Sequence, residues 1–537
     1  MKTWIYPFTI FTLSLLVGCS EPQLPSGIVY CSEGNPESFN PQTVTSGTTI
    51  DATSHQIYDR LVQYDINTNQ LIPSLARKWQ VSQDGLSYRF TLHKHVAFHQ
   101  SERFVPSRFL NADDVLFSFN RIIDKQHPFH DISRTGYPFF QSIDFERLID
   151  RIERVNDHEV VFHLSRKDAS FLSNLATDFA IILSAEYGQQ LLQAGKPEDI
   201  DFFAIGTGPF RLDNYVKNDH IRFKRHQSYW GPYPEPEQLV FDITPNSTGR
   251  LTKLITGDCS VSALPRSAEL AVLDEHPQIV ADSSPGLNVA FWAFNTQKPP
   301  FTDLRVRQAL AHAIDKRNIL DVVYNDTAVE ATGVLPPTSW AYSKIHEPNE
   351  YNPDKARSLL KQANISDLTI DVWAMPVARI YNPNALKMAE LIQADLAKIG
   401  VKLNIISYDW SVFTQKLAQS DYDSVLIGWS ADNSDPDNFF TPILSCNALL
   451  SNNNRSRWCD YGFEHILDEA RALTNQESRK AYFQSAEAII SDRVPIVPIA
   501  HAQKVVLKHK NILDMHVNAY GGISFARTQV STKKRSE

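Results

Sequence analysis

The sequence lacks the local motifs that mark the common hydrolases and nucleotide-binding enzymes. Its 537 residues contain no His-Glu-x-x-His, no Gly-x-x-x-x-Gly-Lys-Ser/Thr and no Gly-x-Ser-x-Gly. Those patterns supply a zinc site, a phosphate cradle and an activated serine. We therefore expect a protein that catalyses no reaction, with no catalytic residues and no cofactor. An exported hydrolase is the alternative that these absences disfavour.

Long basic runs are also missing. The nearest approach is Lys533-Lys534-Arg535 at the tail, and the formal net charge is −9. Nucleic-acid binding calls for a basic surface that neutralises phosphates. We therefore expect no nucleic-acid partner and interpret the basic tail as a solvated end.

Long apolar stretches are absent after the N-terminus, so we expect no membrane span in the mature chain. The N-terminus is typical of an export signal, with Lys2 followed by an apolar stretch from Trp4 to Gly18. It ends in Leu16-Val17-Gly18-Cys19, which resembles the lipobox of bacterial lipoproteins. We expect a signal peptide at 1–18, a lipid on Cys19 and a tether at 19–29. An unlipidated signal with a chance cysteine is the alternative.

Cysteine is scarce, with five residues in the whole chain. Without Cys19 four remain, an even number suited to disulfides in an oxidising compartment. Sequence distance favours Cys446 with Cys459, which leaves Cys31 for Cys259. A zinc site made by all four cysteines is the alternative, but no Cys-x-x-Cys pair supports it. We expect no metal.

Repeats of 20 to 50 residues are absent, which excludes solenoids and propellers. The length predicts two or three domains. Short strand-like runs, at 88–92 and 160–164 for example, alternate with helical patterns such as Leu304 to Val323. This alternation is typical of an α/β fold.

The clearest local unit lies between Tyr381 and Trp429. Asn382 and Pro383 suit the start of a helix that ends near Gly400, and alternating apolar residues then predict a strand at 401–405. A second strand, 425–427, precedes a predicted loop at 428–432. Ligands sit at the carboxyl ends of strands in α/β sheets, so this loop is a candidate site.

Three other groups of residues are interpreted as structural. Gly206-Thr207-Gly208-Pro209 predicts a turn or an interdomain hinge, because a strand-like run follows it instead of a helix. His93, His95 and His99 could bind a metal from a strand, but a solvated strand face is preferred. Asp113 and Asp114 are expected to charge the first turn of a helix.

Two charged residues are the strongest binding candidates. Arg379 precedes the predicted helix start, where a ligand carboxylate would meet a guanidinium fork and the positive end of a helix dipole. Asp432 follows a predicted strand near Trp429, where a carboxylate and an aromatic ring can hold an ammonium group. We expect both side chains to be solvated in an open cleft when no ligand is bound.

Several longer motifs together resemble the large, cluster C (family 5) solute-binding proteins of bacterial ABC importers, which take peptides, nickel chelates or haem. The motifs occur in family order over nearly the whole mature chain. They begin at residues 30–34, 39–41, 46–49, 110–115, 206–210 and 306–310, and end with Ser434-Asp435-Pro436-Asp437-Asn438-Phe439-Phe440. Within the family, the stretches 375–383 and 428–433 are similar to the dipeptide-binding branch, whereas 248–254 and 293–296 lean toward the Sap antimicrobial-peptide-sensitivity branch.

The resemblance implies a periplasmic-binding-protein type II fold with two lobes, an extra domain and a ligand in the interlobe cleft. Domain I would comprise 30–57, 206–285 and 503–531; domain II, 58–205; and domain III, 286–502. It also implies the pairs Cys31 with Cys259 and Cys446 with Cys459. The implied ligand contacts are Arg379 for a carboxylate, Asp432 for an ammonium, and Trp429, Gly428, Ser430, Tyr381, Ser46, Gly47, Thr48 and Thr49 around them.

The function implied is a periplasmic receptor that binds short peptides, dipeptides first, and docks on an ABC permease in the cytoplasmic membrane. The protein would be a monomer, held to a membrane by the lipid on Cys19. A Sap-type protein that binds antimicrobial peptides or haem is the alternative.

Overall fold

The fold comes from a computed structural model, which describes residues 27–531 apart from 66–67, 69, 134, 345–348, 516, 518 and 520–521. The expected signal peptide and the lipid site at Cys19 lie outside the described residues, as does most of the expected tether. Within the described part, no helix is both long and apolar enough to cross a bilayer.

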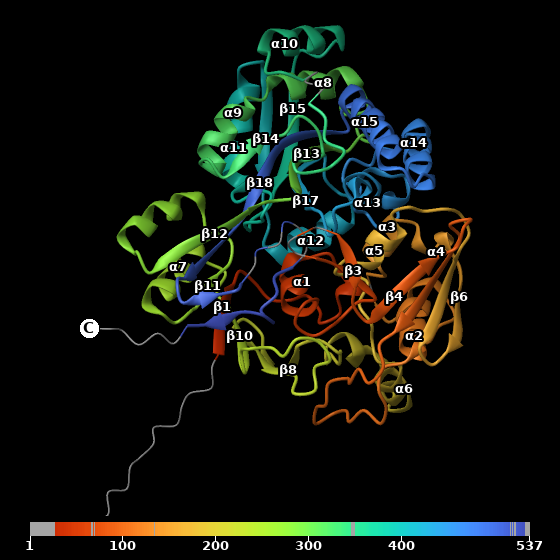
Figure 1. The fold of residues 1–537 in the computed structure, drawn as a ribbon. Coiled ribbons are helices and arrows are strands. Elements are labelled where there is room, and N and C mark those ends of the chain that lie inside the picture. Colours follow the sequence, from red (N-terminus) through yellow and green to blue (C-terminus); the bar gives the residue numbers. More distant parts are fainter. Residues whose placement is uncertain are drawn as a thin grey trace, which may run out of the picture.

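A twelve-stranded sheet runs through both halves of the molecule (Figure 1). Its main path in spatial order is β16 (Val401–Ile406), β15 (Leu368–Ala374), β17 (Ser424–Ser430), β13 (Asn288–Phe294), β18 (Ile496–His509), β11 (Val261–Ser262), β1 (Gly27–Ser32), β10 (Gln238–Ile243), β9 (His220–Arg225) and β8 (Phe210–Val216). Two further strands pair with β18, namely β12 (Ile279–Pro285) and β14 (Ala328–Glu330).

The remaining described strands form three smaller sheets. A four-stranded sheet has the order β4 (Ala76–Val81), β5 (Ser87–Leu92), β7 (Glu159–Leu164) and β6 (Ile149–Asn156). Two hairpin-sized sheets pair β2 (Val62–Tyr64) with β3 (Leu71–Pro73), and β19 (Ile512–Leu513) with β20 (Gln529–Val530). The strands predicted at 88–92 and 160–164 are confirmed within β5 and β7.

Helices are interspersed with these strands along the chain, so the predicted α/β class is confirmed. They are α1 (Gly47–Thr53), α2 (Ala112–Ile123), α3 (Pro138–Ser142), α4 (Phe145–Leu148), α5 (Phe171–Leu175), α6 (Ala185–Gln193), α7 (Ser247–Thr256), α8 (Leu304–Ala313), α9 (Lys316–Ile319), α10 (Pro353–Gln362), α11 (Ala385–Ala397), α12 (Trp410–Ala418), α13 (Thr441–Leu444), α14 (Tyr461–Ala472) and α15 (Gln476–Arg493).

Two large buried cores define two lobes. The first lobe surrounds core residues between Ile28 and Ala263, together with a few from Val506 to Phe525. The second lobe surrounds a core that runs from Leu287 to Ala502. In Figure 1 the green and blue elements of the second lobe lie above the red and orange elements of the first. The finer division into three domains, with the boundaries given above, stays a prediction.

The lobes are joined where the sheet passes from one to the other. Strand β18 pairs with β11 and β12 at one end and with β13 and β14 at the other. At the start of β13, the Asn288 side chain donates to the Ala502 carbonyl at 2.7 Å and accepts from the Ala502 N–H at 2.9 Å. A Cβ on Gly286 would lie 2.3 Å from the same carbonyl oxygen, so only glycine allows this close approach.

The long helix predicted from Leu304 to Val323 is wrong as a single element. Helix α8 ends at Ala313, because the backbone at Ile314 is extended. Asp315 then caps α9 by accepting from the Asn318 N–H, and a π-helix follows at Leu320–Tyr324. The spacing of the apolar residues correctly predicted the buried face of α8, but it gave no sign that the helix ends at Ala313.

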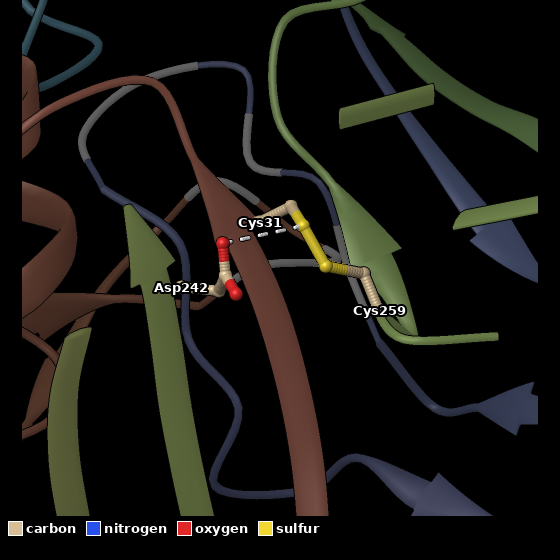
Figure 2. Close-up of side chains that lie close together, drawn as sticks. All are labelled: Cys31, Asp242 and Cys259. Atoms are coloured by element: carbon tan, nitrogen blue, oxygen red, sulfur yellow. Dashed lines mark hydrogen bonds between the residues drawn. A yellow bond between two sulfur atoms is a disulfide. The ribbon is translucent and has the colours of Figure 1, made fainter. Parts of the chain in front are cut away.

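Both disulfides that the resemblance implies are present, Cys31 with Cys259 and Cys446 with Cys459. Figure 2 shows the first of them beside Asp242, whose Oδ1 lies 4.0 Å from Cys31 Sγ. A disulfide sulfur carries no proton to donate, and the Asp242 carboxylate is bound by the Lys253 ammonium at 2.7 and 2.8 Å. This group of three therefore offers no thiolates to a metal ion.

The other motifs interpreted as structural also have packing roles. A Cβ on either Gly206 or Gly208 would collide with the Ile57 backbone, so these glycines permit close packing before β8. The histidines do not share a strand face, because β5 ends at Leu92, and His99 instead lies within hydrogen-bond distance of the Gly208 carbonyl, 2.9 Å away. Asp113 and Asp114 do lie in the first turn of α2, as predicted.

Candidate functional site

Arg379 lies in a tight turn between β15 and α11. Its backbone exchanges two hydrogen bonds with Asn382, of 2.9 and 3.0 Å. Its guanidinium stacks over the Trp410 ring, 4.3 Å from the centroid, and Nη1 donates to the Ala378 carbonyl at 3.2 Å. The same Nη1 lies 3.8 Å from Oε1 of Glu33, a residue of the first lobe. Arg379 thus faces the other lobe across the interface.

The predicted start of the neighbouring helix is wrong. Helix α11 begins at Ala385 and is capped by Asn384, whose side chain accepts from the Lys387 N–H. Asn382 is buried in the turn instead. Arg379 is therefore separated from the helix by that turn, and the dipole of α11 contributes less at its guanidinium than expected.

Asp432 follows β17 and carries an unpartnered buried oxygen. Its N–H donates to Asn438 Oδ1 at 3.2 Å, and Trp429 Nε1 donates to the same oxygen at 3.1 Å. Its Oδ2 has no hydrogen-bond partner among the described residues. Burial raises the pKa of Asp432 well above its usual value, Asp178 raises it further, and Lys504 opposes both. A buried carboxylate with one oxygen that lacks a hydrogen-bond partner can bind a cationic group of a ligand.

Gly428, Trp429 and Ser430 belong to β17 rather than to the loop that the sequence predicted. The strand continues because Ser430 pairs with Asn288 and Trp429 with Val289 on β13. The loop therefore starts at Ala431, and Asp432 lies directly after the strand, where a ligand site was expected.

The Arg379 and Asp432 segments meet at one edge of the sheet. Strands β15 and β17 are parallel neighbours, with Ala374 paired to Leu426, so both segments leave from the same ends. Tyr381 packs against Gly428, where a Cβ would lie 2.4 Å from the Tyr381 ring. Both sequence-predicted residues thus lie in the second lobe, after the same ends of neighbouring strands.

Three further charged groups, Asp51, Asp178 and Lys504, interact electrostatically with Asp432, with Glu33 or with one another. Asp178 of the first lobe is held by Arg60, by His55 Nε2 at 2.8 Å and by the Gly522 N–H at 2.6 Å. Burial raises the pKa of Asp51 to about 7, although the Lys504 charge opposes it. Burial lowers the pKa of Lys504 itself, against the charges of Asp51, Asp178, Glu33 and Asp432. We call Glu33, Asp51, Asp178, Arg379, Asp432 and Lys504 the interlobe site.

The candidate ligand-binding residues 46–49 pack against the segment that follows Glu33. Ser46 precedes α1, and its Oγ donates to Thr49 Oγ1 at 3.2 Å. Thr49 Oγ1 in turn accepts the Glu37 N–H at 2.9 Å, and the Thr48 methyl lies against Gly34. Whether these residues contact a ligand stays a prediction.

The expectation of solvated charges is wrong for this conformation. The side chain of Arg379 is 11% exposed, and Asp432 as a residue is 9% exposed. Both charged groups lie in the contact between the lobes, so they interact with protein groups and not with bulk water.

Sequence reasoning missed Trp410 and four residues of the interlobe site, namely Glu33, Asp51, Asp178 and Lys504. Glu33 stands in a motif that carried the resemblance, but nothing local linked it to Arg379. Lys504 is the one lysine, arginine or acidic residue between Ile496 and Leu507. The other residues of this stretch are apolar, except for His501 and Gln503. A lysine inside a buried strand is a signal that could have singled it out.

Comparison with known proteins gives consistent matches over nearly the whole chain. The family described as bacterial extracellular solute-binding proteins, family 5 Middle, matches residues 70–450. The dipeptide-binding protein of Escherichia coli strain K12 is 42% identical over 504 residues, which cover 94% of each sequence. The peptide transport periplasmic protein SapA of Salmonella typhimurium strain LT2 is 39% identical over 512 residues, 95% of this chain and 93% of that protein.

A solved structure agrees with the fold. The dipeptide binding protein from Pseudoalteromonas sp. SM9913, in complex with Met-Leu, superposes with a TM-score of 0.92 at 43% identity. The match covers 94% of this chain and 100% of the other.

Proposed function

The chain belongs to the bacterial extracellular solute-binding proteins of family 5, and from that membership we propose that it binds short peptides and hands them to an ABC permease. Its fold is the periplasmic-binding-protein type II fold that the resemblance implied. The solved relative that holds Met-Leu supports dipeptides as the first ligands to test.

The observation that carries the proposal is the placement of Arg379 and Asp432 after the same ends of the neighbouring parallel strands β15 and β17. A guanidinium can take a carboxylate in a bidentate fork, and a buried carboxylate with a free oxygen can take an ammonium. A dipeptide spans about 7 Å when extended, at roughly 3.3–3.6 Å per residue. Arg379 and Asp432 could therefore bind the two charged ends of one dipeptide, because both residues follow the same ends of neighbouring strands.

The remaining contacts and the cellular setting belong to the same proposal. Tyr381, Gly428, Trp429 and Ser430 would line the ligand in the second lobe, and residues 46–49 would approach it from the first. The receptor would act without catalysis, as a monomer anchored by a lipid on Cys19. A protein that leaves peptides unchanged after long incubation would support the absence of catalysis.

Binding of modified dipeptides to alanine variants tests the pair. Arg379→Ala and Asp432→Ala should each weaken binding of an unmodified dipeptide at least a hundredfold, because each leaves one ligand charge buried without its partner. Arg379→Ala should also erase the preference for a free over an amidated C-terminus. Asp432→Ala should erase the preference for a free over an acetylated N-terminus. Isothermal titration calorimetry provides the affinities, and parent-like binding by both variants would refute the assignment.

The second candidate is a Sap-type protein whose cargo would be an antimicrobial peptide or haem, and the similarity to SapA supports that type. A deletion strain distinguishes the two. Loss of growth on dipeptides supports the first, whereas new sensitivity to cationic peptides with unchanged dipeptide use supports the second.

A further inference from the structure

We propose that Glu33 is a specificity-determining residue, an internal carboxylate that competes with the ligand's carboxylate for the Arg379 guanidinium. This inference rests on the proposed function, because it takes Arg379 as the ligand-carboxylate site. It adds a residue of the first lobe to a recognition element that otherwise lies in the second.

Glu33 is held at this place by the fold. It directly follows the end of β1, and that end is fixed by the disulfide from Cys31 to Cys259 that Figure 2 shows. Strand β1 is also paired on both sides, with β10 and β11. The backbone that carries Glu33 is therefore anchored, and its side chain reaches the interface from a rigid base.

The contact with Arg379 is close but incomplete. Glu33 Oε1 lies 3.8 Å from Arg379 Nη1, longer than the 2.7–2.9 Å of a charge-assisted hydrogen bond. The Glu33 side chain is 9% exposed, and its Oε2 has no hydrogen-bond partner among the described residues. The Glu33 carboxylate therefore lies beside the guanidinium without a strong hydrogen bond to it.

Two other cations also interact with Glu33 in the part of the chain that the structure describes. Arg250 is close enough to interact electrostatically, but its guanidinium donates to four backbone carbonyls, those of Thr244, Pro245, Ala263 and Leu264. Lys504 interacts with Glu33 as well, but more strongly with Asp51 and Asp178. Arg379 forms a described ion pair with Glu33, at 3.8 Å.

Competition follows from this geometry. A ligand carboxylate on the same guanidinium would lie within a few ångströms of Glu33, inside a site that excludes most water. Two like charges at that distance repel, so each carboxylate lowers the affinity of Arg379 for the other. A ligand without a C-terminal carboxylate would leave the Glu33–Arg379 contact undisturbed.

Glu33→Gln tests the proposal, because it removes the charge while keeping the size and the hydrogen-bonding ability. The affinity for an unmodified dipeptide should rise by a factor on the order of ten, whereas the affinity for its C-terminal amide should change less than threefold. Calorimetric titration of both ligands gives both numbers, and thermal unfolding verifies that the variant is folded.

Glu37→Gln is the matched comparison. Glu37 lies in the same loop and feels the Arg379 charge, but it forms no described ion pair with Arg379 within 4.0 Å. Its gain should therefore be clearly smaller than that of Glu33→Gln. Equal gains would mean that overall charge, and not contact with Arg379, sets the affinity, and would overturn the proposal.

The other possible results also test the proposal. A gain in dipeptide affinity below threefold for Glu33→Gln, or an equal gain for the C-terminal amide, would overturn the proposed competition between Glu33 and the ligand carboxylate. Weaker binding would instead mean that Glu33 positions Arg379, which also overturns it. If the parent protein shows no preference for a free C-terminus, or if Arg379→Ala keeps that preference, the proposed peptide site itself has failed.

Discussion

At the scale of single residues, two buried aspartates in the interlobe site have opposite surroundings. Burial alone would raise the pKa of Asp178, but His55, Arg60 and the Gly522 N–H hold it well below its usual range. Among the described residues Asp432 Oδ2 has no hydrogen-bond partner, and burial raises the pKa of Asp432 although the Lys504 charge opposes the rise. The first carboxylate stabilises the fold as an anion, whereas the second weakens it when ionised.

Asparagine variants should therefore change stability in opposite directions. Asp178→Asn should cost about 3–5 kcal/mol at pH 8, because Arg60, which is 5% exposed, loses its buried counter-charge. Asp432→Asn should raise the free energy of unfolding by about 1 kcal/mol at the same pH, since it removes a carboxyl group whose charge is penalised by burial and whose Oδ2 has no hydrogen-bond partner among the described residues. Denaturant unfolding measures both, and a loss of stability in Asp432→Asn would contradict the account.

The pH dependence gives an independent test of the same two residues. The folded pKa of Asp178 is lowered, so its contribution exists above the unfolded pKa of about 3.9 and is lost as pH falls toward the folded value. The folded pKa of Asp432 is raised, so the parent loses stability as pH rises through that value. The advantage of Asp432→Asn should consequently grow with pH and vanish in acid.

At the scale of elements, the parallel pair β15 and β17 explains why the two ligand-binding candidates meet. The packing of Tyr381 on Gly428 keeps the Arg379 turn against β17. Gly428→Ala would place a Cβ 2.4 Å from both the Tyr381 ring and the Val289 carbonyl oxygen, so either the turn or the strand must move.

We expect Gly428→Ala to cost about 1–3 kcal/mol of stability and to weaken dipeptide binding more than tenfold. Gly249→Ala in α7 is the control, because its Cβ would only touch the Thr244 methyl at 3.2 Å. It should leave affinity unchanged. Parent-like affinity in Gly428→Ala would show that the Tyr381 contact does not position Arg379.

The same elements show how far the sequence could be read. Alternation at 401–405 and the apolar run at 425–427 were enough to find β16 and β17, and local chemistry singled out Arg379 and Asp432. The end of β17 was missed because its partner β13, far away in the chain, extends it to Ser430. The start of α11 was missed because two asparagines, Asn382 and Asn384, can both cap a helix. Glu33 could not be found at all, since its role depends on a contact between the lobes.

At the scale of the whole molecule, the lobes are joined by two strand connections and also contact each other away from them. Arg479 of the second lobe donates to Ser170 Oγ of the first at 3.0 Å, and the Ala169 N–H donates to the Arg471 carbonyl at 2.7 Å. Asn433, next to Asp432, donates to the Ser173 carbonyl at 3.3 Å. Bending at the Gly286–Asn288 connection would separate these contacts and open the site to ligand.

The central claim is that one peptide lies between the lobes with its carboxylate on Arg379 and its ammonium on Asp432. A crystal structure of the protein with a bound dipeptide tests it most directly. We expect ligand oxygens within about 3 Å of the Arg379 guanidinium and the ligand nitrogen within about 3 Å of Asp432 Oδ2. A peptide bound in the reverse direction, or bound elsewhere with Asp432 Oδ2 still unpartnered, would contradict it.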